Sequence, residues 1–289
     1  MKKIKIVRAF LRLTRWNEWV LTAGFAVFGY LLSFSSIGSL DSFFSLIIVF
    51  VFSFSFGFAI NDYFDAPFDK LKTVIRNPIS RGDIKKSHAA AFCFMLFATG
   101  IVLGFFMMPP RSFIPMTFLF LVFFAYSSPP FRMKERRFLG IITHGLFYPL
   151  LFGAAYMLNS VPGIEMLLLS LSVFTMSIVV DMTQEVRDTY VDKISGFRTT
   201  VLSLGYERSL QAITVMSVLA VAAFVATIVV YRPLYLCLMA AGFIPYFRLL
   251  LSKPKRKDIF DKTLKSWNVG IVVSAATGIV LLPFYIGLM

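Results

Sequence analysis

Charged residues are scarce in this sequence of 289 residues. Asp, Glu, Lys and Arg make up 15% of it, whereas soluble domains contain about 25%. Apolar residues reach 58%, the mean hydropathy is +0.78, and phenylalanine alone contributes 34 residues. This composition excludes a soluble globular protein and indicates an integral membrane protein.

Cysteine and histidine are scarcer still, with two of each. Cys93 and Cys237 lie in apolar segments and form no CxxC pair, which excludes a disulfide framework and a thiolate metal centre. His88 and His144 stand alone near the ends of apolar segments, so neither predicts a metal site. No small-residue cleavage site follows the first apolar segment, so we predict no cleavable signal peptide.

Long apolar segments dominate the rest of the chain. A helix needs about 20 apolar residues to cross ~30 Å of hydrocarbon. We therefore predict nine membrane-spanning helices, at residues 17–37, 43–64, 88–108, 113–128, 138–158, 164–184, 209–230, 233–251 and 267–288. The expected fold is an all-α integral membrane bundle, with residues 1–289 forming a single transmembrane domain.

The net charge of +14 follows from the basic residues, whose positions matter more than their number. All 29 of them except Arg111 and Arg232 lie in the N-terminal tail or in every second connection between spans. The positive-inside rule places these segments in the cytoplasm. We therefore expect a multi-pass protein of the plasma membrane with a cytoplasmic N-terminus and an external C-terminus. No nucleic-acid or protein partner is predicted.

The acidic residues gather in two segments, which follow the second and the sixth predicted span. The segments read "NDYFDAPFDK" (61–70) and "DMTQEVRDTYVDK" (181–193). Each contains the pattern D-x-x-x-D-K, and each is followed by a basic turn that contains glycine. Their matching positions predict two similar four-helix halves plus a ninth helix, with a site between the halves.

On a helix these residues form two polar stripes, because successive residues are rotated by about 100°. The first stripe is about 100° wide and comprises Asn61, Asp62, Asp65 and Asp69. The second is about 60° wide and comprises Asp181, Glu185, Asp188 and Asp192. In the first stripe Asp62 is rotated furthest from Asn61. Pro67 predicts a kink or a helix end, which would place Asp69 on the following loop.

Carboxylates crowded at a membrane boundary repel one another, so their presence indicates a function. They could relay protons, coordinate transported cations, or hold divalent metal ions that bind a polyanion. Magnesium (Mg²⁺) is held by one or two carboxylates and by substrate phosphate oxygens. Nearby basic residues suit phosphate recognition: Arg76, Arg81, Arg132, Lys134 and Arg198. The third purpose fits best, and it predicts a Mg²⁺-dependent diphosphate site for a substrate with a lipid tail.

These residues resemble the motifs of the UbiA superfamily of intramembrane prenyltransferases. The first motif, NDxxDxxxD, is complete at residues 61–69, and the second, DxxxD, is present as Asp188 and Asp192. Further segments resemble the family in the same order: "RNPISRG" (76–82), with Asn77 between arginine and proline, then "YSSPPFRMK" (126–134) and "GFRTT" (196–200). The resemblance therefore covers nearly the whole chain.

The resemblance implies a nine-helix bundle with a central cavity, and Mg²⁺-dependent transfer of an isoprenyl group from its diphosphate to an acceptor. It assigns the metal ligands Asn61, Asp62, Asp65, Asp69, Asp188 and Asp192. Arg76, Arg132 and Lys134 would contact the diphosphate. Tyr126 and Ser127 would lie near the reacting carbon. Asp181, deeper in the second stripe, would face the acceptor as a base or positioning group.

The acceptor is left open by these motifs. Family members prenylate aromatic rings, haem, chlorophyllide, isoprenoid lipids or glyceryl phosphates. We expect a polyprenyl diphosphate donor such as geranylgeranyl diphosphate and an aromatic or lipid acceptor. The alternative acceptor is geranylgeranylglyceryl phosphate of archaeal ether-lipid synthesis, because residues 61–70 and 76–82 look most like archaeal and related bacterial members.

Two other classes of membrane protein carry acidic clusters. A cation-coupled secondary transporter would place its charges near the bilayer midplane in broken helices, whereas these lie at span ends. A CDP-alcohol phosphotransferase would need glycine where this chain has Ala66.

Overall fold

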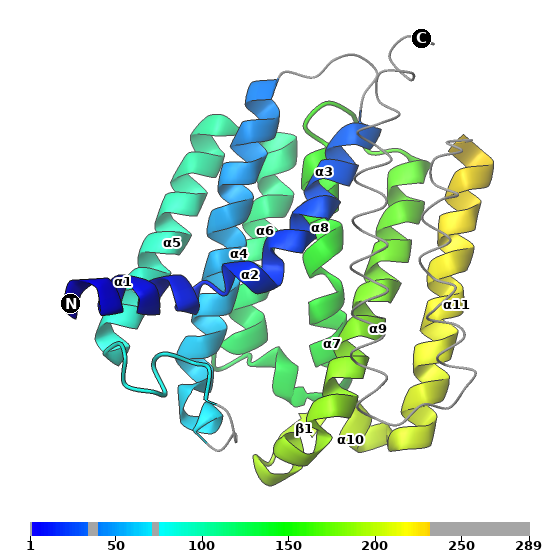
Figure 1. Ribbon diagram of the computed structural model, residues 1–289. Coiled ribbons are helices and arrows are strands. Elements are labelled where there is room, and N and C mark those ends of the chain that lie inside the picture. Colours follow the sequence, from blue (N-terminus) through cyan, green and yellow to red (C-terminus); the bar gives the residue numbers. More distant parts are fainter. Residues whose placement is uncertain (1, 34–39, 71–74, 232–289) are drawn as a thin grey trace.

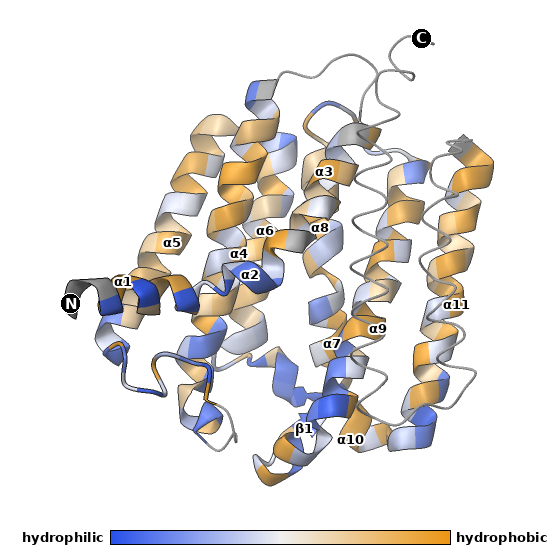
Figure 2. Cartoon of the chain, in the orientation of Figure 1, coloured by the Kyte–Doolittle hydropathy of each residue, from blue (hydrophilic) through white to orange (hydrophobic). Residues whose placement is uncertain are grey.

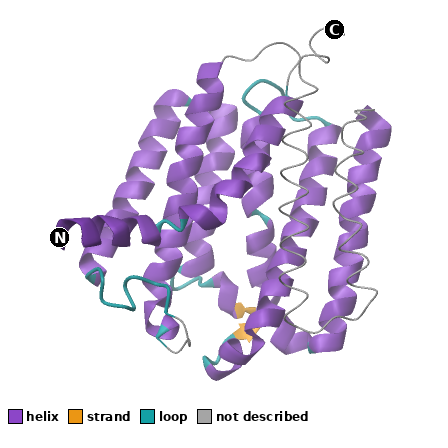
Figure 3. Cartoon of the chain, in the orientation of Figure 1, coloured by secondary structure: helices purple, strands orange, loops and turns teal. Residues whose placement is uncertain are grey.

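The computed structural model describes residues 2–33, 40–70 and 75–231, which form a bundle of upright helices with one helix lying across it (Figure 1). The helices of the first half are α1 (Lys2–Leu13), α2 (Trp16–Trp19), η1 (Val20–Thr22), α3 (Ala23–Leu32), α4 (Leu40–Asp69), α5 (Lys86–Met107) and α6 (Pro110–Ser127). Those that follow are η2 (Met133–Glu135), α7 (Arg137–Gly145), α8 (Phe147–Tyr156), α9 (Ile164–Ile194), α10 (Thr200–Leu204) and α11 (Tyr206–Tyr231). The short strand β1 (Arg198–Thr199) forms bridges to Arg136 and Arg137 (Figure 3).

Six helical segments within the described residues are long and apolar enough to cross a membrane. They are Asp41–Asp69, Lys86–Met107, Pro110–Ser127, Arg137–Tyr156, Ile164–Ile194 and Tyr206–Val230. Each matches a predicted span, so the all-helical, multi-pass architecture is confirmed. The predicted spans 233–251 and 267–288 lie outside the described residues. The count of nine helices, the two matching halves and the central cavity therefore stay predictions.

The described part of the first predicted span, 17–37, is helical but is not one regular α-helix. Residues 16–32 form α2, the 3₁₀ turn η1 and then α3. The chain enters α2 through Arg15, whose φ of 48° lies in the left-handed region. This sharp entry separates α1, which lies across the bundle, from α3, which rises obliquely (Figure 1).

The outer faces of the long helices are apolar along most of their length, and hydrophilic residues collect at one end of the bundle (Figure 2). Phe94 and Phe106 on α5 are 72% and 78% exposed, and Val229 on α11 is 71% exposed. Large exposed apolar side chains on several helices are expected where lipid replaces water as the solvent.

Aromatic side chains fill the interior between α4 and α6. Phe54 meets Phe123 edge-on at a centroid distance of 5.2 Å, and Phe120 is fully buried. Gly57 makes this packing possible, because a Cβ atom there would lie 2.7 Å from the Phe123 ring. Small residues allow close helix approach in membranes, where dispersion contacts carry much of the packing energy.

The fifth span is broken between α7 and α8 at Leu146. Pro149 lies in the first turn of α8, where it has no N–H to donate back to Gly145. The break places His144 in the last turn of α7, facing α9, and Ser177 of α9 donates a hydrogen bond to the His144 carbonyl at 3.0 Å.

Pro67 does not end the helix, and the prediction that Asp69 lies on the following loop is wrong. Helix α4 continues through Pro67, and Asp69 is its last residue. The following loop stabilises this last turn, since the Ser80 hydroxyl donates to the Ala66 carbonyl at 2.8 Å. A proline near a helix end costs little when other groups satisfy the carbonyls there.

Candidate active site

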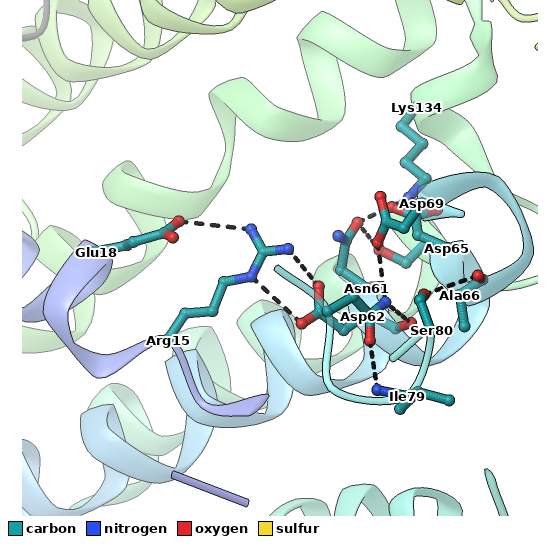
Figure 4. A network of polar contacts seen from close by, with 12 residues as sticks. Arg15, Glu18, Asn61, Asp62, Asp65, Ala66, Asp69, Ile79, Ser80 and Lys134 are labelled. Atoms are coloured by element: carbon teal, nitrogen blue, oxygen red, sulfur yellow. Dashed lines mark hydrogen bonds and ion pairs between the residues drawn. The ribbon is translucent and has the colours of Figure 1, made fainter. Parts of the chain in front are cut away.

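The N-terminal carboxylate cluster (Asn61, Asp62, Asp65 and Asp69) occupies the last turns of α4 (Figure 4). Asn61 and Asp65 are four residues apart and therefore share one helix face. The Lys134 ammonium lies between them, with Nζ 2.7 Å from Asn61 Oδ1 and 2.5 Å from Asp65 Oδ1. Arg132 adds a hydrogen bond to Asp65 at 3.2 Å. Two predicted phosphate ligands thus meet two predicted metal ligands.

Asp62 and Asp69 are buried and have different partners. Asp62 is 1% exposed and is bound by the Arg15 guanidinium, whose Nη2 and Nε both contact its carboxylate (Figure 4). Asp69 accepts a hydrogen bond from the Asn77 amide at 2.9 Å, and the same amide donates to the Asp62 carbonyl at 2.7 Å. Asn77 Oδ1 accepts from the Ile79 N–H at 3.0 Å, which fixes the turn around Asn77.

The loop that carries Arg132 and Lys134 is held against the cluster by aromatic rings. The Arg132 guanidinium lies 4.8 Å from the centroid of Phe68 on α4 and 5.9 Å from that of Phe197, which precedes β1. The Phe68 and Phe197 rings are themselves 5.1 Å apart. Burial lowers the pKa of the Lys134 ammonium, although Asp65 opposes part of that shift. This loop therefore brings the end of α4 together with the segment that follows α9.

The C-terminal carboxylate cluster (Asp181, Glu185, Asp188 and Asp192) lies along the second half of α9. Asp181 and Glu185 are buried, and Glu185 accepts a hydrogen bond from the Val201 N–H at 2.8 Å. Glu185 thereby anchors the start of α10. Asp188 is paired with the adjacent Arg187 at 2.6 Å, and both side chains are about two-fifths exposed, at 42% and 40%.

Helix α6 connects the two clusters through its last two residues. The Ser127 hydroxyl donates to Asn61 Oδ1 at 3.2 Å, and the Tyr126 hydroxyl donates to Asp181 Oδ1 at 3.5 Å. Ser127 thus contacts the N-terminal cluster and Tyr126 contacts the C-terminal cluster. Both residues are predicted to lie near the reacting carbon.

The remaining predicted phosphate ligands lie at the same end of the bundle but are exposed. Arg76 and Arg81 belong to the loop between α4 and α5, and Arg81 is paired with Asp83 at 3.2 Å. Arg198 belongs to β1 and pairs through its backbone with Arg136. Their role as diphosphate ligands stays a prediction.

A magnesium ion fits the N-terminal cluster. Within residues 2–33, 40–70 and 75–231, no group of three or more His, Cys, Asp or Glu side chains is arranged to hold a metal. Mg²⁺ does not require such a group, because it takes one or two protein carboxylates and completes its shell with water and phosphate oxygens. The oxygens of Asn61 and Asp65 already converge on one cation, the Lys134 ammonium.

A profile of the UbiA prenyltransferase family matches residues 22–269. The chain belongs to this family. The matched residues include both carboxylate clusters and the α6 residues between them. The prediction that this membrane protein is a prenyltransferase is therefore confirmed.

Archaeal proteins are among the relatives of this UbiA family member. It is 25% identical over 219 residues to digeranylgeranylglyceryl phosphate synthase of Thermococcus kodakarensis, covering 75% of this chain and 76% of that protein. It is 27% identical over 269 residues to the enzyme of the same name from Methanosarcina barkeri, covering 86% and 90%. A UbiA homolog from Archaeoglobus fulgidus, solved bound to GPP and Mg²⁺, has the same fold, with a TM-score of 0.79 at 19% identity over 95% and 99% of the two chains.

Three residues of this UbiA site are not identifiable from the motifs alone. Arg15 is one of several basic residues of the N-terminal tail in the sequence, although it binds Asp62 in the structure. Asn77 interrupts the Arg-Pro pattern, and an asparagine before proline is a turn signal that could have marked it. His144 is an isolated histidine in the sequence, and no local pattern indicates that it faces Asp181.

Proposed function

We propose that this protein transfers a geranylgeranyl group from geranylgeranyl diphosphate to the free hydroxyl of geranylgeranylglyceryl phosphate. The observation that carries the proposal is the convergence of Asn61, Asp65, Lys134 and Arg132 beside Tyr126 and Ser127. The relatives named digeranylgeranylglyceryl phosphate synthase favour this acceptor over an aromatic one. The whole chain would act as one transmembrane domain.

The two carboxylate clusters would hold Mg²⁺, with Asn61, Asp62, Asp65 and Asp69 on one side and Asp188 and Asp192 on the other. When bound, Mg²⁺ neutralises the negative charge that develops on the departing diphosphate. Among the first set, Asn61 and Asp65 have the best placed oxygens. Asp62 is the least accessible, because its side chain is 1% exposed, against 17% for that of Asp65.

Lys134 and Arg132 would bind the diphosphate oxygens. Both already lie beside Asp65, so they need little rearrangement to donate to a bound polyanion. Preorganised donors of this kind stabilise the leaving group more than water does. Arg76, Arg81 and Arg198 would add positive charge around the entrance.

The reaction exchanges one C–O bond for another. The bond between C1 of the isoprenyl chain and the diphosphate oxygen breaks, and its electron pair leaves with the diphosphate. The acceptor oxygen then attacks the allylic cation at C1 and loses its proton. Tyr126 and Ser127 would line the place where this exchange occurs, and Asp181 would face the acceptor.

The site would lie on the cytoplasmic side of the plasma membrane, because nearly all basic residues belong to segments on that side. This orientation gives a water-soluble diphosphate headgroup access to the clusters while the isoprenyl chain stays in the bilayer.

A transfer assay on the detergent-purified protein tests this proposal. Radiolabelled geranylgeranyl diphosphate is incubated with Mg²⁺ or with EDTA, in parallel with geranylgeranylglyceryl phosphate and with a panel of hydroxylated aromatic acceptors. We expect Mg²⁺-dependent label in the ether lipid only. Label in an aromatic product would show that the acceptor is an aromatic compound and not geranylgeranylglyceryl phosphate. Transfer that persists in EDTA would contradict the role of the metal.

A further inference from the structure

A buried polar network around Asp181, the deepest member of the C-terminal cluster, is not explained by diphosphate binding. It joins Tyr126 on α6, Asp181 and Ser177 on α9, and His144 on α7. His144 Nε2 lies 4.0 Å from Asp181 Oδ1, and the two side chains are 11% and 7% exposed. The Tyr126 hydroxyl donates to the same carboxylate oxygen at 3.5 Å.

Hydrogen bonding determines which nitrogen of His144 carries the proton. The Ser177 hydroxyl lies 3.0 Å from the His144 carbonyl and 3.1 Å from its Nδ1. A carbonyl only accepts, so the single Ser177 proton is donated to it. The Ser177 oxygen must then accept from Nδ1–H, which assigns the proton of the neutral ring to Nδ1.

This tautomer leaves the lone pair of Nε2 directed toward Asp181. A neutral imidazole with a free Nε2 is a base, and a neighbouring carboxylate stabilises the imidazolium that forms. Rings fix the imidazole in place, since Phe147 lies 4.9 Å and Tyr148 6.1 Å from it between centroids. Among the residues that the structure describes, the other titratable groups around Asp181 are Tyr126, Tyr148 and, one helical turn along α9, Glu185.

Tyr126 provides the connection to the reaction. Its hydroxyl donates its only proton to Asp181, so its oxygen is left as an acceptor. The adjacent Ser127 contacts Asn61 of the N-terminal cluster. The network thus runs from the place where the diphosphate would leave to a buried base.

We propose that Tyr126, Asp181 and His144 form a relay that removes the proton from an alcohol acceptor. The inference rests on the proposed function and adds the residues that take up the proton of the acceptor hydroxyl as its oxygen bonds to C1. The acceptor proton passes to the Tyr126 oxygen, and the Tyr126 proton passes to the Asp181–His144 pair. One proton leaves the acceptor and one is gained by the pair. Ser177 acts as a positioning residue through the His144 tautomer.

The test compares alcohol and thiol acceptors in the full-length protein. The probes are geranylgeranylglyceryl phosphate and its analogue with sulfur in place of the nucleophilic hydroxyl oxygen. A thiol, with a pKa of about 8.5 in cysteine, needs far less help from a base than an alcohol does. His144→Gln keeps a polar group near Asp181 but takes up no proton.

For His144→Gln we expect kcat with the alcohol to fall by at least about 100-fold, with KM for both substrates nearly unchanged. With the thiol the loss should be less than about tenfold, because the base is no longer needed. Ser177→Ala should lower kcat with the alcohol by about tenfold, the effect of one hydrogen bond. Mg²⁺-dependent binding of geranylgeranyl diphosphate should be unchanged in both variants.

Ser172→Ala is the matched control. Ser172 lies on the same helix, is also buried, and donates to a carbonyl on another helix, Ala220, at 2.8 Å. It should keep wild-type kcat. Equal losses with alcohol and thiol in His144→Gln, or an unchanged kcat with the alcohol, would overturn the relay while the transfer activity stands. If the wild-type protein transfers no geranylgeranyl group to geranylgeranylglyceryl phosphate, both the proposed function and the relay that rests on it are contradicted.

Discussion

The two carboxylate clusters have similar sequences but different surroundings. The N-terminal cluster is held by side chains from the N-terminal segment, the loop after α4 and the loop after α6. In the C-terminal cluster the deep members, Asp181 and Glu185, are buried in contacts with α6, α7 and α10, whereas Asp188 is half-exposed beside Arg187. The first cluster and the deep members of the second are therefore held by buried contacts, whereas Asp188 is paired with Arg187 at the surface of α9.

This difference has an energetic reason. A buried carboxylate needs a partner, because an unpaired buried charge costs several kcal/mol. A carboxylate at an exposed helix end is solvated by water and gains little from its salt bridge. The following variants test this difference between the buried, paired carboxylates and the exposed one.

The largest expected effect is at the buried pair of Arg15 and Asp62. Arg15→Leu leaves Asp62 without its cation and should lower the free energy of unfolding by about 3–5 kcal/mol. Thermal unfolding of the purified protein in detergent measures the loss. The double variant Arg15→Leu/Asp62→Asn should recover most of it, because no charge is then left unpaired. A single variant as stable as wild type would show that the pair does not hold the cluster.

The next effect concerns catalysis. Asp65→Asn and Asp188→Asn each remove one anionic oxygen ligand and should lower kcat by about 10²- to 10³-fold. Melting temperatures should stay near wild type for Asp188→Asn, since its carboxylate is half-exposed. Steady-state transfer kinetics and thermal unfolding measure the two quantities side by side. Retained activity in both variants would refute the model of two metal-binding clusters.

A smaller effect is expected at Asn77. Asn77→Ala leaves the Asp69 carboxylate and the Asp62 carbonyl without the Asn77 donor in a buried site, which should cost about 1–3 kcal/mol. The matched control is Asn159→Ala, which removes a half-buried amide that donates to Ser33 at 3.0 Å. The control should lose less stability in the same unfolding measurement. Equal losses would mean that the turn at Asn77 gives the cluster no special support.

The smallest effect should be at Arg187. Arg187→Ala breaks an exposed salt bridge, so the free energy of unfolding should change by no more than about 1 kcal/mol. Denaturation at low and at high salt measures it, and added salt should reduce even this difference. A loss as large as that of Arg15→Leu would contradict the contrast between the two clusters.

Much of this protein is predictable from its sequence. Lipid leaves no water to satisfy backbone groups, so these apolar segments bond their backbones within helices, and six of the predicted spans are helical in the structure. The grouping of the carboxylates is also predictable from the sequence, because it follows from helical periodicity. Residues four apart share a helix face, which is why the spacing of Asn61 and Asp65 alone places them together.

The contacts between distant segments were decided only by the tertiary structure. Arg15 meets Asp62, Lys134 meets Asp65, and His144 faces Asp181, although each pair is far apart in the sequence. Helical periodicity describes the faces of one helix and says nothing about which neighbour each face meets. The sequence by itself therefore determined a membrane prenyltransferase with two acidic motifs. Packing decided which carboxylates are buried, which partner each of them meets, and where a buried histidine could receive a proton.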